Sequence, residues 1–467
     1  MEEPKAKAVL RVALLALLVW TPLPFGAVQP GAVLALELHA ALLGLLALWV
    51  LKHDADRLPP VARRVLALSA IVLAVGLLQL IPLPQSWIAT LAPQAAEARA
   101  LLTPILKSQS TFAPLSLEPQ ATADALLRFT SYVLVGLAAA VALDTPERVK
   151  QAAWVLAASG AFQALYGATE YLSGHQHIFG YAKRFYTDEA SGTFINRNHF
   201  AAYLAATLPL ALAMATRGRA KRTTATSWRE RGLALLEPRG VGLVVAALAA
   251  AAIWIGIVLS YSRAGFAVAL AATVAFALGA AGRVRAAGRV AAALLLLPTL
   301  VLLFQEVRAP GERFAADEEE LRTLGGRVEV WGVGLEMAKE HVVLGTGLGT
   351  FESAFAPRRP PGVELRWTHA HSDWLEAAIE GGLPVLCAVA GIALLVVRHL
   401  LRAARGAVPA ALAAALLALA IHAAVDFPLR IPAVAVVAAV LVGAALSVEE
   451  EPAGASLVVL ARPVAVA

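Results

Sequence analysis

Long apolar blocks alternate with short polar connections along most of the chain. The blocks are roughly 17–24 residues long, the length of helix that crosses a hydrocarbon core about 30 Å thick. A transmembrane β-barrel would instead require alternating segments of about ten residues. The pattern therefore predicts an all-α polytopic membrane protein with about twelve transmembrane helices. The predicted spans are 8–25, 29–51, 61–81, 126–143, 150–172, 198–215, 240–259, 265–281, 289–305, 376–398, 407–425 and 431–447.

The composition agrees with this prediction. Of 467 residues, 59% are hydrophobic and 15% are charged, whereas soluble domains average about 45–50% apolar and about 25% charged residues. The net charge of +6 could suggest nucleic-acid binding, but the basic residues concentrate in short connections, where they report topology. We therefore expect no nucleic-acid partner. The single cysteine, Cys387, excludes an intramolecular disulfide.

Lysine and arginine fall on alternate connections, so by the positive-inside rule these connections and both termini are cytoplasmic. His, Asp, Glu, Asn, Tyr and Arg gather on the opposite, outer connections. We therefore expect the chemistry at the outer membrane–water boundary. The predicted organisation is 1–305 with helices 1–9, 306–375 as a large periplasmic loop carrying catalytic residues, and 376–467 with helices 10–12 and a cytoplasmic tail.

The stretch SYSRAG places Arg263 at the mouth of a predicted span. A guanidinium near the bilayer is costly and usually pairs with or binds something. Its planar fork of donors suits a phosphate, and Tyr261 adds a hydrogen-bonding group. The alternative is an arginine that snorkels to the lipid headgroups. We favour a phosphate clamp.

The stretch INRNHF also places polar residues directly before a span. Asn198 could cap that helix, while the free N–H groups of a helix N-terminus attract an anion. We interpret Arg197 as a second phosphate clamp with Asn198 beside it, and Asn196 and His199 as structural residues. Among lesser signals, His175 and His177 lie in an outer loop and are expected to be solvated.

The stretch GGRVEVWGVGLEMAKEH predicts a helix over 327–341 in the large outer loop. Trp331, Leu335 and Ala338 form an apolar stripe at helical spacing. Arg327 at its start is unusual, because cations are disfavoured near a helix N-terminus. This misfit suggests an anionic ligand, although a salt bridge is an equally good explanation. The following GTGLGTF lacks a dinucleotide fingerprint and predicts a turn.

The stretch HAHSD contains His369, His371 and Asp373, all potential metal ligands. No pattern for a fourth ligand follows, so we favour a different reading. Asp373 or Ser372 caps the next helix, with Glu376 completing a capping box. His371 then lies just outside a helix N-terminus, whose partial positive charge favours the neutral imidazole that a general base requires.

These residues together indicate transfer chemistry on a phosphorylated lipid. Arginines would bind the anion and stabilise the charge on the leaving group, and histidine would take a proton from a hydroxyl. The predicted outer connections contain no Asp-x-Asp pair to hold a divalent ion, since Asp54 and Asp56 lie on a cytoplasmic connection, so we expect neither a metal nor another cofactor. A transporter of lipid-linked sugars is the alternative, but it should show inverted repeats with interrupted helices.

The order of SGTFINRNHF, LSYSRAG, GGRVEVW, LGTGLGTF and HAHSDWLEAAIEGGL resembles the O-antigen ligase and polymerase superfamily. The resemblance implies a C-type membrane glycosyltransferase of the bacterial inner membrane, with its active site facing the periplasm. Ligases of this kind transfer a glycan from undecaprenyl diphosphate to a sugar of the lipid A core, invert the anomeric centre and use no metal. The relatives leave two alternatives open: a polymerase of polysaccharide repeats, or a protein O-oligosaccharyltransferase.

By the same resemblance, His371 matches the base that activates the acceptor hydroxyl. Arg263 and Arg197 match arginines that grip the donor diphosphate, and Arg327 matches a loop arginine. His369, Asp373, Tyr261 and Asn198 complete the expected substrate-binding set. The ligase pattern ends in Gly, Thr or Tyr where this chain has Val385, a departure that concerns the ligase assignment rather than the superfamily.

Overall fold

The computed structural model describes residues 5–53, 58–93, 95–97, 111–216, 237–280, 318–360, 366–402 and 406–448. Its α-helices are α1 (Lys5–Trp20), α2 (Pro30–His53), α3 (Pro60–Leu80), α4 (Gln85–Leu91), α6 (Pro119–Ala142), α7 (Pro146–Leu172), α8 (Arg197–Thr216), α10 (Pro238–Leu259), α11 (Arg263–Ala280), α14 (Glu318–Glu340), α15 (Phe351–Phe355), α16 (Asp373–Arg402), α17 (Ala407–Val425) and α18 (Pro432–Leu446). Three short 3₁₀ helices are η1 (Phe25–Ala27), η3 (Ala356–Arg358) and η4 (Pro428–Arg430). Two small antiparallel hairpins pair β1 (Pro82–Pro84) with β2 (Phe112–Pro114), and β3 (His177–Ile178) with β4 (Tyr181–Ala182).

The predicted fold class is confirmed. Within the described residues, eight helices are long and apolar enough to cross a membrane: α2, α3, α6, α8, α10, α11, α16 and α17. Every predicted span except 289–305 coincides with a helix, and 289–305 lies outside the described residues. However, α1 and α18 are only 16 and 15 residues long, and α7 is not among the eight. The count of twelve spans therefore stays a prediction.

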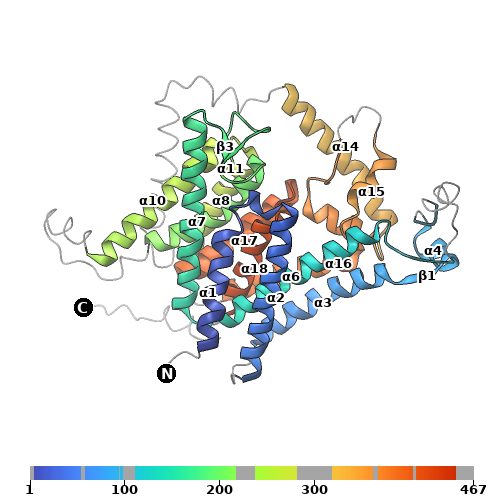
Figure 1. Ribbon diagram of the computed structural model, residues 1–467, viewed down its shortest axis with the longest axis horizontal. Coiled ribbons are helices and arrows are strands. Elements are labelled where there is room, and N and C mark those ends of the chain that lie inside the picture. The colour runs from blue at the N-terminus through green and yellow to red at the C-terminus, as the bar shows by residue number, and fades with distance from the viewer. Residues whose placement is uncertain are drawn as a thin grey trace, which may run out of the picture.

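Helix α8 lies at the centre of one group of helices and packs against α7, α10, α11 and α17. Its membrane-length window is 94% buried, because small side chains allow close approach between neighbouring helices. For example, a Cβ on Gly160 of α7 would lie only 2.3 Å from the Thr207 hydroxyl of α8. A second group contains α3, α6, α16 and α18. The two groups are the scaffold that positions the polar loops (Figure 1).

Helix α16 is interrupted at Gly382, whose φ of +66° lies in the left-handed region. A Cβ here would lie 2.6 Å from the Val342 carbonyl oxygen, so the position favours glycine. The loop after α14 docks at this interruption: Thr346 N–H donates to the Ile379 carbonyl at 2.9 Å, and Gly347 N–H donates to the Glu380 carbonyl at 3.1 Å. The stretch 345–350 is neither helix nor strand, as the predicted turn requires.

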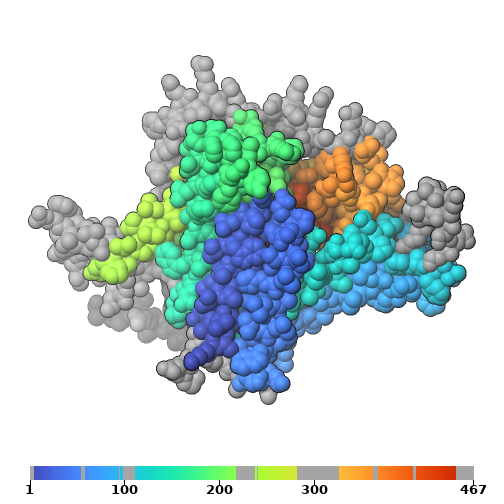
Figure 2. All heavy atoms as spheres, in the orientation of Figure 1, coloured from blue at the N-terminus to red at the C-terminus, as the bar shows by residue number. Residues whose placement is uncertain are grey.

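The helix predicted over 327–341 is real, but its start and its buried face differ from the prediction. Helix α14 begins at Glu318, so Arg327 lies inside the helix rather than at its start. Val330 and Met337 are buried, whereas Leu335 is 54% exposed. Both stripes have helical spacing, and α14 buries the one that faces α16. In Figure 2, α14 and α15 and the segment around β3 flank the upper ends of α1 and α2.

Candidate functional site

His371 lies in the loop immediately before α16 and is held from three sides. Its ring packs edge-on against Trp367 and Phe427, with centroid distances of 5.2 and 4.9 Å. Its Nδ1 lies 3.0 Å from Oδ1 of Asp426. The backbone at His371 is in the left-handed region, with φ of +50°, a conformation that is uncommon for non-glycine residues and occurs at functional sites. The side chain remains 23% exposed.

Asp426 follows the last residue of α17 and is 1% exposed. Its Oδ1 also accepts the backbone N–H of Phe427 at 3.0 Å. Burial alone would raise the pKa of this carboxyl, but the hydrogen bond with His371 and the nearby histidines hold the pKa well below its usual range. An ionised Asp426 accepts a hydrogen bond from Nδ1–H of His371 and so leaves Nε2 of the imidazole as the acceptor. This is the relation between the histidine and the carboxylate in a catalytic triad.

His369 takes a different partner from His371. Its Nδ1 lies 3.2 Å from Oε1 of Glu376, which also accepts the Ala370 N–H at 2.7 Å, and its ring stacks on Phe427. Glu376 is fully buried. The predicted capping box is therefore wrong: Ser372 caps α16 by accepting the Leu375 N–H at 3.3 Å, and Glu376 belongs to an interior network.

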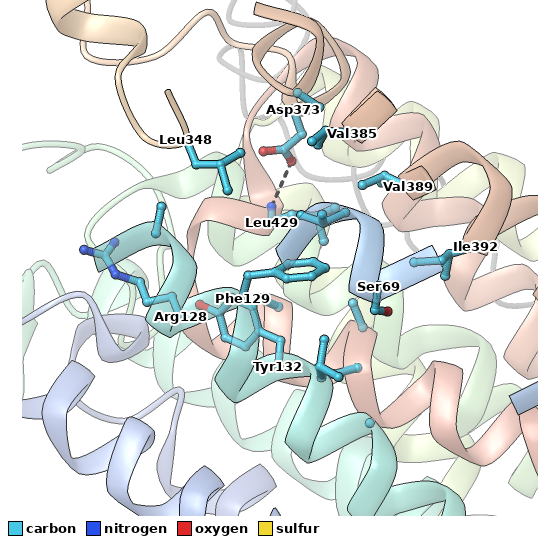
Figure 3. A pocket seen from close by; sticks show the side chains of 18 of the residues that line it. Ser69, Arg128, Phe129, Tyr132, Leu348, Asp373, Val385, Val389, Ile392 and Leu429 are labelled. Atoms are coloured by element: carbon cyan, nitrogen blue, oxygen red, sulfur yellow. Dashed lines mark hydrogen bonds between the residues drawn. The ribbon is translucent and has the colours of Figure 1, made fainter. Parts of the chain in front are cut away.

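Arg430 is the centre of that network. Its Nη2 lies 2.6 Å from Glu380 and 3.0 Å from Glu376, and its Nε lies 3.8 Å from Asp373. Burial disfavours the charged guanidinium, yet these three carboxylates raise the pKa of Arg430 above its usual range. Asp373 also accepts the Leu429 N–H at 2.9 Å (Figure 3). The buried network joins α16 to the turn that carries Asp426. Of the three residues considered as metal ligands from the sequence, His371 thus pairs with Asp426, whereas His369 and Asp373 both join the Arg430 network.

The predicted arginines Arg197 and Arg263 are the first residues of α8 and α11. The two helix starts are joined, because the hydroxyl of Ser262 donates to Oδ1 of Asn198 at 2.8 Å. Asn198 is not the helix cap considered from the sequence. Instead, Asn196 accepts the Asn198 N–H at 2.7 Å. Nη1 of Arg197 lies 2.8 Å from Glu189.

Residues at the start of α8 and in α14 contact the end of α17 and the turn that follows it. His199 packs edge-on against Phe427 with a centroid distance of 4.7 Å, and Arg327 donates to the Val425 carbonyl at 3.4 Å. Tyr186, which the sequence did not single out, lies beneath the Arg197 guanidinium. Burial raises the pKa of Tyr186, and the charges of both Arg197 and Asp426 act on it. Arg327 and His371 thus meet at this turn, and Arg197 lies two residues before His199, which packs against it.

Tyr261, a predicted substrate-binding residue, contacts a residue of α7. Its hydroxyl lies 3.1 Å from that of Tyr171 at the end of α7, and its side chain is 6% exposed. Its backbone has a φ of +50° two residues before Arg263. We interpret Tyr261 as a residue that fixes the start of α11.

A cavity of about 600 Å³ opens beside the Arg430 network, between α3, α6, α16 and α18 (Figure 3). Its polar end contains Asp124, Arg128, His369, Asp373, Glu380 and Arg430, and most other lining residues are apolar. We call this the apolar cavity. His369 borders it and also stacks on Phe427, which contacts His371. The cavity therefore leads from apolar helices toward the histidine–aspartate pair.

From the sequence, Asp426 and Arg430 frame the outer turn DFPLR, from which either could reach the site, whereas Phe427 and Glu380 were not singled out. Two charged residues, Asp426 and Arg430, and an intervening proline stand between two apolar spans. That interruption was the available signal. The partners themselves could not be found, because His371 and Asp426 are 55 positions apart.

The fold and these contacts define a multi-pass membrane protein with a histidine–carboxylate pair beside several arginines. Residues 244–390 match the model of the protein family described as O-antigen ligase. The match confirms the resemblance to the O-antigen ligase superfamily, whose members are glycosyltransferase-type enzymes of polysaccharide biosynthesis. No curated protein matches the chain.

Proposed function

We propose that this protein is an inverting glycosyltransferase of the O-antigen ligase type in the bacterial inner membrane. It transfers a glycan from undecaprenyl diphosphate to an acceptor hydroxyl on the periplasmic side. The observation that supports this most strongly is the bond between His371 and the buried Asp426. That bond lies at the turn after α17, which Arg327 of α14 also contacts.

In this proposal His371 is the general base. Nδ1–H of His371 donates to Asp426, and Nε2 takes the proton of the acceptor hydroxyl. The hydroxyl oxygen forms a bond to the anomeric carbon while the bond from that carbon to the diphosphate oxygen breaks. Attack opposite the leaving group inverts the anomeric centre. Asp426 stabilises the imidazolium that forms and is a positioning residue.

The arginines bind the donor diphosphate and stabilise the negative charge that grows on it. Arg197 and Arg263 stand at helix N-termini, where free N–H groups add to the attraction for an anion. Arg327 approaches from α14. Guanidinium groups supply the charge stabilisation that a divalent ion supplies in other transferases, so the reaction is proposed to be metal-independent.

The apolar cavity supports a lipid-linked substrate. Its walls come from helices of membrane length, and its polar groups gather at the end beside His369. A lipid chain seated there would bring its head toward His371. We propose a sugar of the lipid A core as the acceptor. Val385 departs from the ligase pattern and lines the same cavity. Because of this departure, a repeat polymerase or a protein O-oligosaccharyltransferase is the second candidate.

The proposal is tested by deleting the gene and analysing surface polysaccharide and undecaprenyl-linked intermediates together. Loss of a ligase leaves long polymer on the lipid carrier, and wild-type protein restores surface polymer. Single repeat units on the carrier would indicate a polymerase instead. Units retained on the inner leaflet would indicate a transporter and overturn the proposed transfer.

A further inference from the structure

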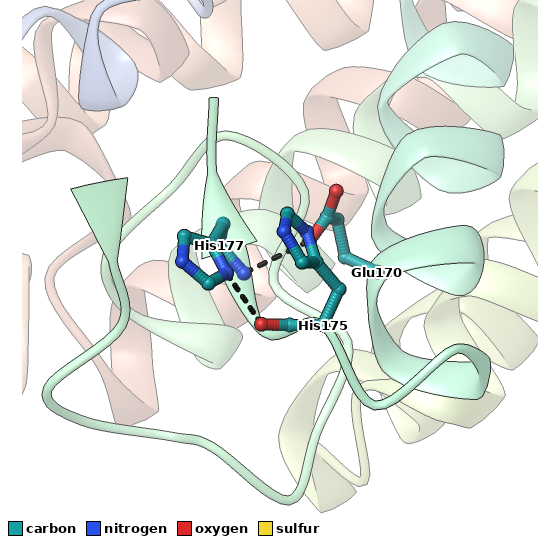
Figure 4. A group of neighbouring side chains, drawn as sticks. All are labelled: Glu170, His175 and His177. Carbon is teal, nitrogen blue, oxygen red and sulfur yellow. Dashed lines mark hydrogen bonds and ion pairs between the residues drawn. The ribbon is translucent and has the colours of Figure 1, made fainter. Parts of the chain in front are cut away.

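The last turn of α7 and the following β3–β4 hairpin bring Glu170, His175 and His177 together (Figure 4). The sequence suggested that the two histidines are merely solvated. Instead, Nδ1 of His175 lies 2.8 Å from Oε2 of Glu170, and the same oxygen accepts the His177 N–H at 2.9 Å. The two imidazole rings stack with centroids 3.9 Å apart.

An ion pair between Glu170 and His175 alone does not explain why the His177 ring stacks on the His175 ring. Protonation of both imidazoles would place two positive charges about 4 Å apart, an unfavourable arrangement. Neutral imidazoles carry a free nitrogen lone pair and are the commonest metal ligands. Nδ1 of His177 also bonds the His175 carbonyl, the kind of contact that orients the other nitrogen of a metal-binding histidine.

We propose that Glu170, His175 and His177 bind a late first-row divalent ion such as Zn²⁺. One ligand atom from each residue lies within 4.8 Å of the others. Tetrahedral coordination with bonds of about 2.0–2.1 Å brings ligand atoms to about 3.3 Å apart, so the group closes by at most about 1.5 Å. The His175 side chain is 58% exposed. Two imidazoles and one carboxylate suit Zn²⁺, Cu²⁺ or Ni²⁺, whereas Mg²⁺ and Ca²⁺ prefer oxygen ligands.

The bound ion fastens the hairpin to α7 and supports the loop that follows. Nζ of Lys183, directly after β4, donates to the Glu189 carbonyl at 2.8 Å. The Glu189 carboxylate in turn holds Arg197. The ion is therefore structural and lies away from His371. Only its influence on donor binding, through Arg197, rests on the proposed function.

Metal binding is measured directly on the full-length protein, purified in detergent without a histidine tag and stripped by a chelator. Zn²⁺ is titrated in competition with a chromogenic chelator, and bound zinc is counted after dialysis. We expect about one Zn²⁺ per chain and at least a ~10-fold weaker affinity for His177→Ala. His53→Ala removes an exposed histidine at the end of α2 and should bind as the wild type does.

Thermal melting separates loss of the site from loss of folding. Without zinc, His177→Ala and the wild type should melt together, because His177 is partly exposed in the two-residue strand β3. Zinc should raise the Tm of the wild type and of His53→Ala but not of His177→Ala. The proposal would be overturned if the wild type bound less than one Zn²⁺ per chain. It would also be overturned if His177→Ala kept the zinc affinity and the zinc-induced rise in Tm of the wild type. Neither measurement requires turnover, so failure here is distinct from failure of the transferase proposal.

Discussion

His369 and His371 stand two residues apart, contact the same phenylalanine and each meet a buried carboxylate, yet their surroundings differ. His371, just before α16, bonds Asp426, just after α17. Among the described residues, no lysine or arginine forms an ion pair with Asp426. His369 meets Glu376, which is already paired with Arg430. The first carboxylate is available to stabilise an imidazolium, whereas the second already shares the cation Arg430 with Glu380 and Asp373. We therefore infer that His371 acts on substrate and His369 fixes the loop.

The largest expected effect is that of removing His371. Replacement by Ala should lower the transfer rate by about 10²–10⁴-fold, the range for loss of a general base. The protein should remain folded, because His371 precedes α16 and is partly exposed. Transfer is measured with purified protein and a lipid-linked glycan donor, with His53→Ala as the control. A rate within threefold of the wild type would exclude His371 as the base.

Removing Arg430 should chiefly affect folding. Arg430→Met leaves Glu376 and Glu380 buried without their cation, and breaking a buried pair in this way costs about 3–5 kcal/mol. Melting in detergent reports the change. The matched control is Lys339→Met, which breaks an exposed pair with Glu336 and should leave the Tm unchanged. Equal melting of both variants would show that the network does not stabilise the fold.

A smaller effect is expected for Arg263→Lys. Lysine keeps the positive charge but loses the planar fork that bonds two oxygens of a diphosphate. Losing one charge-assisted hydrogen bond corresponds to about a 10-fold lower kcat/KM for the donor. Arg148→Lys, which alters an arginine paired with Asp144 at the start of α7, serves as the control. Unchanged donor use in Arg263→Lys would argue against a diphosphate clamp.

The sequence predicted the fold class and most helices because membrane spans are long and locally apolar. It was less successful where a helix has more than one apolar stripe. In α14, Val330 and Met337 are fully buried, whereas Trp331 and Ala338 of the predicted stripe are partly buried and Leu335 is exposed. That choice depends on packing against α16 and is invisible in the helix itself.

The candidate site was only partly predictable for a related reason. His371, Arg197 and Arg263 stand at span ends, where polarity is conspicuous. The capping roles considered for Glu376 and Asn198 were wrong, because local capping rules cannot anticipate the distant partners Arg430 and Ser262. The pairing of His371 with Asp426 likewise joins segments brought together only by tertiary structure.

The most direct test compares the two carboxylates in one assay. Asp426→Asn and Glu376→Gln each remove one charge with little change of shape, and kcat and Tm are measured for both. The account predicts that Asp426→Asn lowers kcat by about 10²-fold or more with little change in Tm, whereas Glu376→Gln lowers the Tm and leaves the kcat of folded protein within about threefold. Full activity in Asp426→Asn, together with loss of activity in folded Glu376→Gln, would contradict it and assign the base to His369.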